Sequence, residues 1–166
     1  MKISNFNTAK FSSQTYGNNM LIKDVINIIV NYMSFDPKNA YSFIIGTDST
    51  GKNDGNKISY ISAIIIHKVG KGGIYFWHKR RDIGYSLYER IFKEANMSIE
   101  LTEVFLNELK LRNIHNFSFE IHVDVGTKGK TRGIVNEVIG MIRAMGHKVV
   151  VKPNSFAASK VADKYT

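Results

Sequence analysis

The chain has 166 residues, of which 43% are hydrophobic and 22% are charged, and this predicts one globular domain over residues 1–166 rather than a disordered chain. The formal net charge is +9, with 23 Lys and Arg against 14 Asp and Glu. Such an excess favours nucleic acid as the partner, with a solvated basic surface as the alternative.

The composition also bears on location and on metal chemistry. No apolar run approaches the ~18 residues that a membrane span needs, and the first twenty residues lack an apolar signal core. We therefore expect a cytoplasmic protein without a membrane partner. Because there is no cysteine, disulfides and thiolate metal sites are excluded, and carboxylates and imidazoles remain as metal ligands.

Residues 1–18 are polar and show no sustained period, which predicts a polar arm or loop. An extra N-terminal helix is expected over residues 19–34, starting at about Met20 with Asn18 or Asn19 as its N-cap. Its apolar residues recur at three- and four-residue spacings: Leu21, Val25, Ile28, Ile29 and Tyr32. Asp36-Pro37 ends this helix.

Three strands follow in close succession. Residues 41–50 (YSFIIGTDST) are an apolar run of strand length, residues 57–68 are rich in β-branched side chains, and residues 74–79 form a third strand. The turn-forming stretches GKNDGN and GKGG separate them. This spacing predicts an antiparallel meander.

The second half of the chain alternates helices and strands. Helical spacing extends over residues 86–112, with a capping-box signal at Ser86 and Glu89, and fits either one helix or two that break near Asn96. A strand over residues 117–125, a helix over 131–145, a strand over 147–152 and a helix from Ser155 to the end of the chain complete the order. We expect an α/β fold with a five-stranded mixed sheet, three strands antiparallel and two parallel, and helices on both faces.

Asp48 ends the first long strand, where an aspartate is costly unless a partner pairs with it. Taken alone, Asp48 and Ser49 also fit an ordinary turn in which each bonds its own backbone. Asp124 favours the functional reading, because HVDVG repeats the plan of an apolar strand, an aspartate at its end and a glycine-containing loop before a helix. If the two strands are parallel neighbours, both carboxylates emerge at one edge of the sheet, where ligands bind in α/β proteins. Two anions so close need a proton or a cation between them, and a divalent metal is the usual solution.

The helix after the meander starts near Asp48 and runs away from it, so early acids are favoured. Glu100 lies on the margin of the apolar stripe, Glu103 points away from it, and Glu108 is about 12 Å further along the axis. We therefore select Glu100, with an ordinary surface glutamate as the alternative. Asp163 in AASKVAD is the last acid, and a frayed helix terminus is its alternative role.

In their order and on these elements, Asp48, Glu100, Asp124 and Asp163 resemble the acids of the ribonuclease H-like superfamily. GTDS, NMSIEL, VDV and VAD are similar to its four motifs. More narrowly, IGTDS, HVDVG with GKT following, and KPNSFAASKVAD resemble the YkuK family of predicted ribonuclease H-like proteins. The resemblance covers a core over residues 41–163. It implies a nuclease that hydrolyses phosphodiester bonds with two Mg²⁺ or Mn²⁺ ions held by these four acids. A ribonuclease H-like module that binds nucleic acid or a protein without cutting is the alternative.

Two basic clusters are candidates for nucleic-acid binding. They are Lys79, Arg80 and Arg81 at the end of the third strand, and Lys128, Lys130 and Arg132 between Asp124 and the start of the following helix. That loop ends in Gly-Lys-Thr before a helix, but the spacing of a nucleotide-binding P-loop would require glycine where Asp124 stands. Ser49 and His122 are candidates for an auxiliary role, since His122 shares a strand face with Asp124. A packed, hydrogen-bonded histidine is the alternative for His122.

Overall fold

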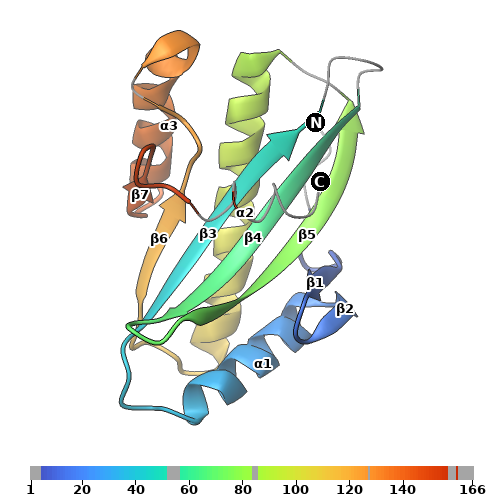
Figure 1. Cartoon of the computed structure of the whole chain (residues 1–166), viewed down its shortest axis with the longest axis vertical. Coiled ribbons are helices and arrows are strands. Elements are labelled where there is room, and N and C mark those ends of the chain that lie inside the picture. Colours follow the sequence, from blue (N-terminus) through green and yellow to red (C-terminus); the bar gives the residue numbers. More distant parts are fainter. Residues whose placement is uncertain (1–4, 52–56, 84–85, 127, 157–159, 161–166) are drawn as a thin grey trace.

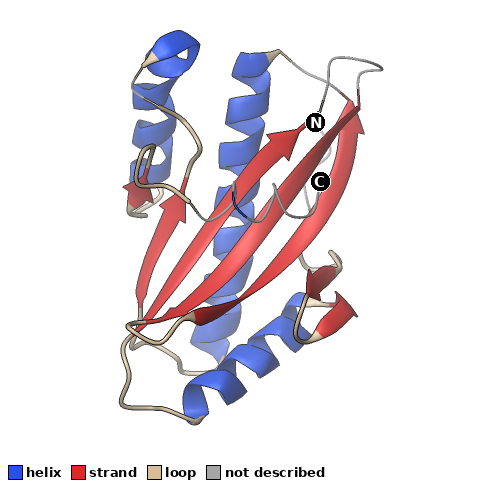
Figure 2. Cartoon of the chain, in the orientation of Figure 1, coloured by secondary structure: helices blue, strands red, loops and turns tan. Residues whose placement is uncertain are grey.

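The computed structural model describes residues 5–51, 57–83, 86–126, 128–156 and 160. A seven-stranded mixed sheet with the order β2-β1-β5-β4-β3-β6-β7 is its centre (Figure 1, Figure 2). The expected α/β class is therefore confirmed, but the expected number of five strands is wrong.

Three long strands form the predicted antiparallel meander. They are β3 (Tyr41–Thr50), β4 (Lys57–Lys68) and β5 (Gly73–Ile83), with all of β3 and all of β5 paired to β4. On β4, the run YISAIII is buried on both faces apart from Ile65, which is half-buried, and this explains its continuous apolar character.

Two shorter parallel strands extend the sheet beyond β3. β6 (Ser118–His122) pairs with β3, and β7 (Val149–Val150) pairs with β6. Both are shorter than the strands predicted over 117–125 and 147–152, because the regular register of the pair covers only Ile121 with Val149 and His122 with Val150. Backbone hydrogen bonds continue past the strand ends, from Val123 N to Val150 O at 2.9 Å and from Lys152 N to Val125 O at 3.0 Å.

The two additional strands come from the segment expected to be a polar arm. β1 (Phe11–Ser13) pairs with β5, and β2 (Gly17–Met20) pairs with β1 at the edge of the sheet. Phe6 and Phe11 are fully buried in the core, so a few apolar anchors hold this otherwise polar segment to the sheet.

Three α-helices have both ends in the described residues, α1 (Ile22–Ser34), α2 (Leu87–Leu111) and α3 (Arg132–Ala144), and Lys160 is also helical. α1 starts two residues later than predicted, with Leu21 as its N-cap instead of Asn18 or Asn19, because the chain up to Met20 is in β2. α2 is a single helix, and Ser86 and Glu89 form the predicted capping box. A short 3₁₀ turn, η1 (Gly129–Thr131), precedes α3.

All three helices pack against the same face of the sheet. One core cluster joins α1 and the second half of α2 to Phe43, Ile45, Tyr60, Ile64 and Phe76 of the long strands. A second cluster joins α3 and the first half of α2 to Ile121, Val123 and Val125. The predicted helix from Ser155 onward, which would cover the other face, lies outside the described residues except for Ser155, Phe156 and Lys160. Within the part of the chain that the structure describes, no helix is long and apolar enough to cross a membrane.

Candidate functional site

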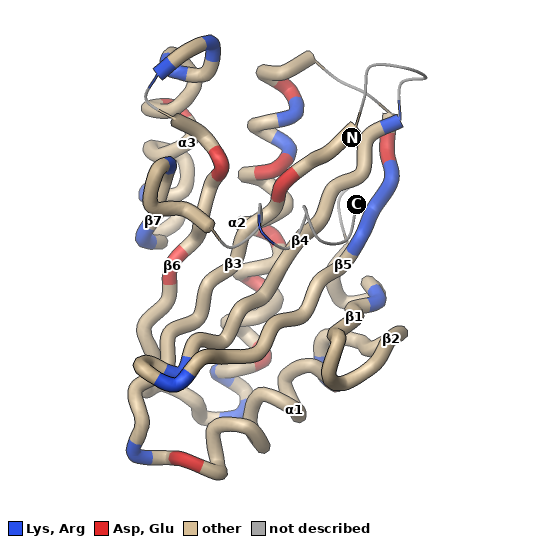
Figure 3. Tube along the Cα trace, in the orientation of Figure 1, with Lys and Arg blue, Asp and Glu red and all other residues tan. Residues whose placement is uncertain are grey.

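The ends of β3 and β6 and the start of α2 lie toward the same end of the sheet (Figure 1). Gly46 pairs with His122 in the parallel β3–β6 register, so Asp48 and Asp124 each lie two residues beyond the same position. Both side chains are half-buried. Figure 3 shows acidic positions on β3, after β6 and on the first half of α2 at this end of the molecule. β3 and β6 are therefore parallel neighbours, as predicted from the sequence, and the two aspartates lie at the same end of the sheet.

Glu94 is the acid that α2 contributes to this edge. It is the eighth residue of the helix, its exposed fraction is 5%, and its Oε1 accepts a hydrogen bond from Ser49 Oγ at 2.5 Å. Burial raises the pKa of Glu94 to about 8; the Ser49 hydrogen bond acts against this, whereas the charges of Asp48 and Asp124 add to it. A buried carboxyl group thus lies within electrostatic range of two other carboxylates.

Arg90, one turn before Glu94, brings a positive charge to the same cluster. Its Nε and Nη2 donate to Ser49 Oγ at 3.1 and 2.9 Å, and Nη2 also donates to the Ser49 carbonyl oxygen at 3.2 Å. The Arg90 charge lowers the pKa of Glu94, although burial has the larger effect. Ser49 therefore links the guanidinium of Arg90 to the carboxyl group of Glu94.

The two aspartates make contacts of their own. Asp48 Oδ1 accepts the Ser49 backbone N–H at 2.8 Å, and Asp124 Oδ1 pairs with Lys152 Nζ at 3.0 Å. Among the described residues, no group of three or more His, Asp or Glu is close enough to hold one metal ion together. Carboxylates repel one another in a partly buried site, and here they turn to separate donors. Carboxylate oxygens are nevertheless the ligands that Mg²⁺ and Mn²⁺ prefer, so the chemistry of this donor set fits such ions.

Glu100 and Asp163 are the other two predicted acids, and of these only Glu100 lies in the described residues. Glu100 is half-buried on α2, six residues beyond Glu94 and therefore about 9 Å further along the helix axis. Asp163 lies outside the described residues. Sequence reasoning favoured early acids on this helix but passed over Glu94. The available signal was the capping box at Ser86, which fixes the helix start and places Glu94 little more than two turns into the helix.

His122 is a packed residue with both ring nitrogens engaged. Its exposed fraction is 2%, Nε2 lies 2.7 Å from Glu120 Oε1, and Nδ1 accepts the backbone N–H of Phe156 at 3.1 Å. Since Nδ1 is an acceptor here, the proton of the neutral ring is on Nε2 and is donated to Glu120. The ring also makes an edge contact with Phe156, 4.8 Å between centroids. These contacts tie the segment after β7 to β6.

The predicted basic residues lie on both sides of the carboxylates. Lys128, Lys130 and Arg132 are exposed at η1 and the start of α3, and Lys128 and Arg132 line an open pocket of about 480 Å³. Lys79 and Arg81 are exposed on β5, where Figure 3 shows a run of basic positions. Arg80 points to the opposite face of β5 and pairs with Asp82 at 3.3 Å.

A second charged cluster joins α2 to β5 next to Glu94. Lys93, whose side chain is 7% exposed, forms an ion pair with Asp82, and its Nζ lies 5.0 Å from the ring centroid of Tyr60. The hydrogen bond from Lys93 lowers the pKa of Asp82. Because Lys93 is paired in this way, its positive charge is directed to β5 rather than to the three carboxylates.

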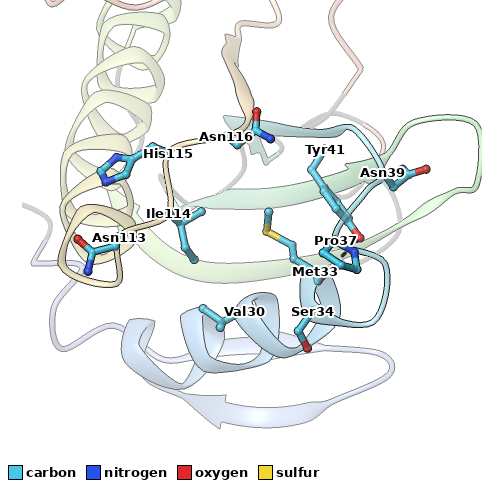
Figure 4. Close-up of a pocket in the computed structure, with 10 residues that line it drawn as sticks. All are labelled: Val30, Met33, Ser34, Pro37, Asn39, Tyr41, Asn113, Ile114, His115 and Asn116. Atoms are coloured by element: carbon cyan, nitrogen blue, oxygen red, sulfur yellow. Dashed lines mark hydrogen bonds between the residues drawn. The ribbon is translucent and has the colours of Figure 1, made fainter.

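A separate pocket of about 270 Å³ lies at the other end of the sheet, between the end of α1, the start of β3 and the segment before β6 (Figure 4). Val30, Met33 and Ile114 supply apolar surface, while Asn113, His115 and Asn116 supply polar groups. Its lining contains no carboxylate, so the edge with Asp48, Glu94 and Asp124 is the stronger candidate for chemistry.

The fold and this edge define an α/β protein with acids at the carboxyl ends of parallel neighbouring strands. The chain belongs to the ribonuclease H-like family, whose model matches residues 24–166. It is similar to the protein named Uncharacterized protein YkuK of Bacillus subtilis (strain 168), with 31% identity over 160 residues, which cover 89% of this chain and 91% of that protein. No solved structure matches the chain significantly. The expected relationship to the ribonuclease H-like and YkuK proteins is confirmed.

Proposed function

We propose that this protein is a metal-dependent nuclease that hydrolyses phosphodiester bonds of RNA or DNA. Asp48, Glu94, Asp124 and Asp163 form its carboxylate set in this proposal. The observation that supports it best is the buried Glu94 carboxyl group, held within electrostatic range of Asp48 and Asp124 at the sheet edge. A buried acid next to two other acids is unfavourable for stability and is typical of sites that bind a cation.

Glu94 replaces Glu100 as the helix acid because its charge is coupled to those of Asp48 and Asp124. Asp48, on β3 between β4 and β6, would hold the metal ions together with Glu94 and Asp124. Two Mg²⁺ or Mn²⁺ ions supply an activated water and a counter-charge for the leaving oxygen when bound. Lys128, exposed four residues after Asp124, would hold a backbone phosphate of the nucleic acid.

The test uses the full-length protein with labelled single-stranded RNA, single-stranded DNA and RNA–DNA hybrid, in Mg²⁺, Mn²⁺ or EDTA. We expect metal-dependent cleavage that Asp48→Asn and Asp124→Asn each reduce by at least about 100-fold, since each removes a ligand charge. Glu94→Gln and Glu100→Gln are compared directly, and only the former should show a similar loss. Glu103→Gln, an exposed change on the same helix, is the control. Cleavage that Asp48→Asn leaves unchanged would exclude this mechanism.

A non-catalytic module that binds nucleic acid is the second candidate. The ion pair between Lys152 and Asp124 favours it, because a lysine there neutralises a carboxylate that a nuclease needs for a metal ion. Binding of nucleic acid that is equally strong in EDTA and in Mn²⁺, without cleavage of any of the three substrates, would support this candidate over the nuclease.

A further inference from the structure

Arg90 makes three hydrogen bonds to a single residue of the neighbouring strand. Its Nε and Nη2 both donate to Ser49 Oγ, and Nη2 also donates to the Ser49 carbonyl oxygen. A guanidinium has five donor hydrogens and no acceptor, so the direction of these bonds is unambiguous. Arg90 therefore fixes both the backbone and the side chain of Ser49 at the end of β3.

The hydroxyl group of Ser49 has two acceptor sites and one hydrogen to donate. Arg90 donates to the acceptor side, which directs the hydrogen to Glu94 Oε1 at 2.5 Å. Ser49 is only 8% exposed and Glu94 5%, so bulk water does not compete for this bond. The direction of the Ser49 hydroxyl, and with it the position of the Glu94 carboxyl group, thus depends on Arg90.

Glu94 needs such a restraint because its side chain is flexible. A glutamate side chain has three rotatable bonds through which it can move, and the charges of Asp48 and Asp124 raise its pKa and so oppose its ionised form. Arg90 is the cation on its own helix that acts against this and lowers the pKa of Glu94. It acts on Glu94 both through its charge and through the hydroxyl group that it orients.

We propose that Arg90 is a positioning residue, which holds the Glu94 carboxyl group at the end of β3 by orienting the Ser49 hydroxyl group. This rests on the proposed function insofar as the positioned carboxylate is a metal ligand. Arg90 itself contacts neither a metal ion nor the reacting phosphate in this scheme. A merely structural role, in which Arg90 only fastens α2 to β3, is the competing explanation.

The first experiment compares crystal structures of the metal-free wild type and Arg90→Gln. We expect the Glu94 carboxyl group to leave Ser49 Oγ in the variant while α2 and β3 keep their backbone positions. Arg90→Lys, which retains the charge but not the planar fork of donors, is the second variant should Arg90→Gln unfold. An unmoved Glu94 side chain in the folded variant would overturn the proposal.

The second experiment measures Mn²⁺ affinity by the electron paramagnetic resonance signal of the free ion. Loss of a group that orients a metal ligand typically weakens binding 10- to 100-fold. We expect this for Arg90→Gln and for Ser49→Ala, with no additional loss in the double variant, because both act on the same carboxylate. Ser49→Thr, which keeps the hydroxyl group, should restore binding. A structural role predicts additive losses and no rescue, and either result would contradict the proposal.

Arg112→Gln is the matched control. Arg112, which caps the other end of α2, donates from Nη1 to Asn27 Oδ1 of α1, so the change removes the same charge and a comparable contact between elements. It should leave Mn²⁺ affinity unchanged. If the wild type itself binds no Mn²⁺, the metal-dependent function fails, whereas the crystal structures still decide whether Arg90 positions Glu94. If Mn²⁺ binds and Arg90→Gln has no effect, only the positioning role fails.

Discussion

Glu94→Gln should change how the stability of the protein depends on pH. Burial raises the pKa of Glu94 from 4.5 to about 8, so between these pH values the native state holds a proton that the unfolded chain has lost. The free energy of unfolding of the wild type therefore falls as pH rises from about 4.5 to 8. Glutamine cannot ionise, and its side-chain oxygen still accepts the Ser49 hydrogen bond. The variant lacks this decline.

The size of the effect follows from the same two pKa values. At about 1.36 kcal/mol for each pH unit, the largest gain of the variant over the wild type between pH 4.5 and pH 8 is about 5 kcal/mol. Contributions from the other titrating groups cancel when the variant is compared with the wild type at each pH. Below pH 4.5 the difference between the two proteins should be small, because Glu94 is then mostly protonated in both the native and the unfolded state.

Urea unfolding at pH 5, 6, 7, 8 and 9, followed by circular dichroism, measures this difference. Glu103→Gln is the control, since Glu103 is exposed on the same helix, and its difference from the wild type should not vary with pH. Added Mn²⁺ should stabilise the wild type by about 2.7 kcal/mol at 100 times its dissociation constant, and Glu94→Gln by less. A constant difference between Glu94→Gln and the wild type across this pH range would refute the reasoning.

Three further predictions concern charges around the site. Lys152→Met should tighten Mn²⁺ binding up to about fivefold, because the exposed ion pair with Asp124 is worth at most about 1 kcal/mol. Weaker binding by the variant would show that Lys152 does not compete with the ion for Asp124. Lys128→Ala should lower the slope of log affinity against log salt for nucleic acid by about one, and an unchanged slope would remove Lys128 from the interface. Asp82→Ala should lower the free energy of unfolding by about 3–5 kcal/mol in urea, because it leaves the charge of Lys93 buried and unpaired. A decrease below about 1 kcal/mol would mean that water reaches Lys93.

Local patterns in the sequence were sufficient to predict those helices and strands that contain an apolar stretch of their own. The meander, the capped start of α2 and the two strands that lead to Asp48 and Asp124 follow from alternation, turn residues and a capping box, and all are present. β1 and β2 could not be inferred in this way. They are three and four residues long and mostly polar, and they exist because Phe6 and Phe11 insert into a core that other elements build.

Glu94 was overlooked because the buried face of α2 changes character along the helix. Its second half buries Leu101, Phe105 and Leu109, which produce the apolar stripe used to choose Glu100. The first half buries Lys93 and Glu94, which a pattern of apolar residues cannot reveal. The polar groups of α2 can be buried because they have partners on the strands, here Ser49 of β3 and Asp82 of β5. These pairings appear only in the tertiary structure.

The polar first half of α2 contains one buried pair that stabilises the fold, Lys93 with Asp82, and one buried acid, Glu94, that belongs to the candidate site. Lys93 and Asp82 neutralise each other, so they serve to fasten α2 to β5. Glu94 has no such closely matched cation: Arg90 binds Ser49, and the pKa of Glu94 stays raised by burial. A glutamine or an apolar residue would fill the same position without this penalty. A buried acid that resists ionisation is therefore better explained by a cation that it shares with Asp48 and Asp124 than by the stability of the helix.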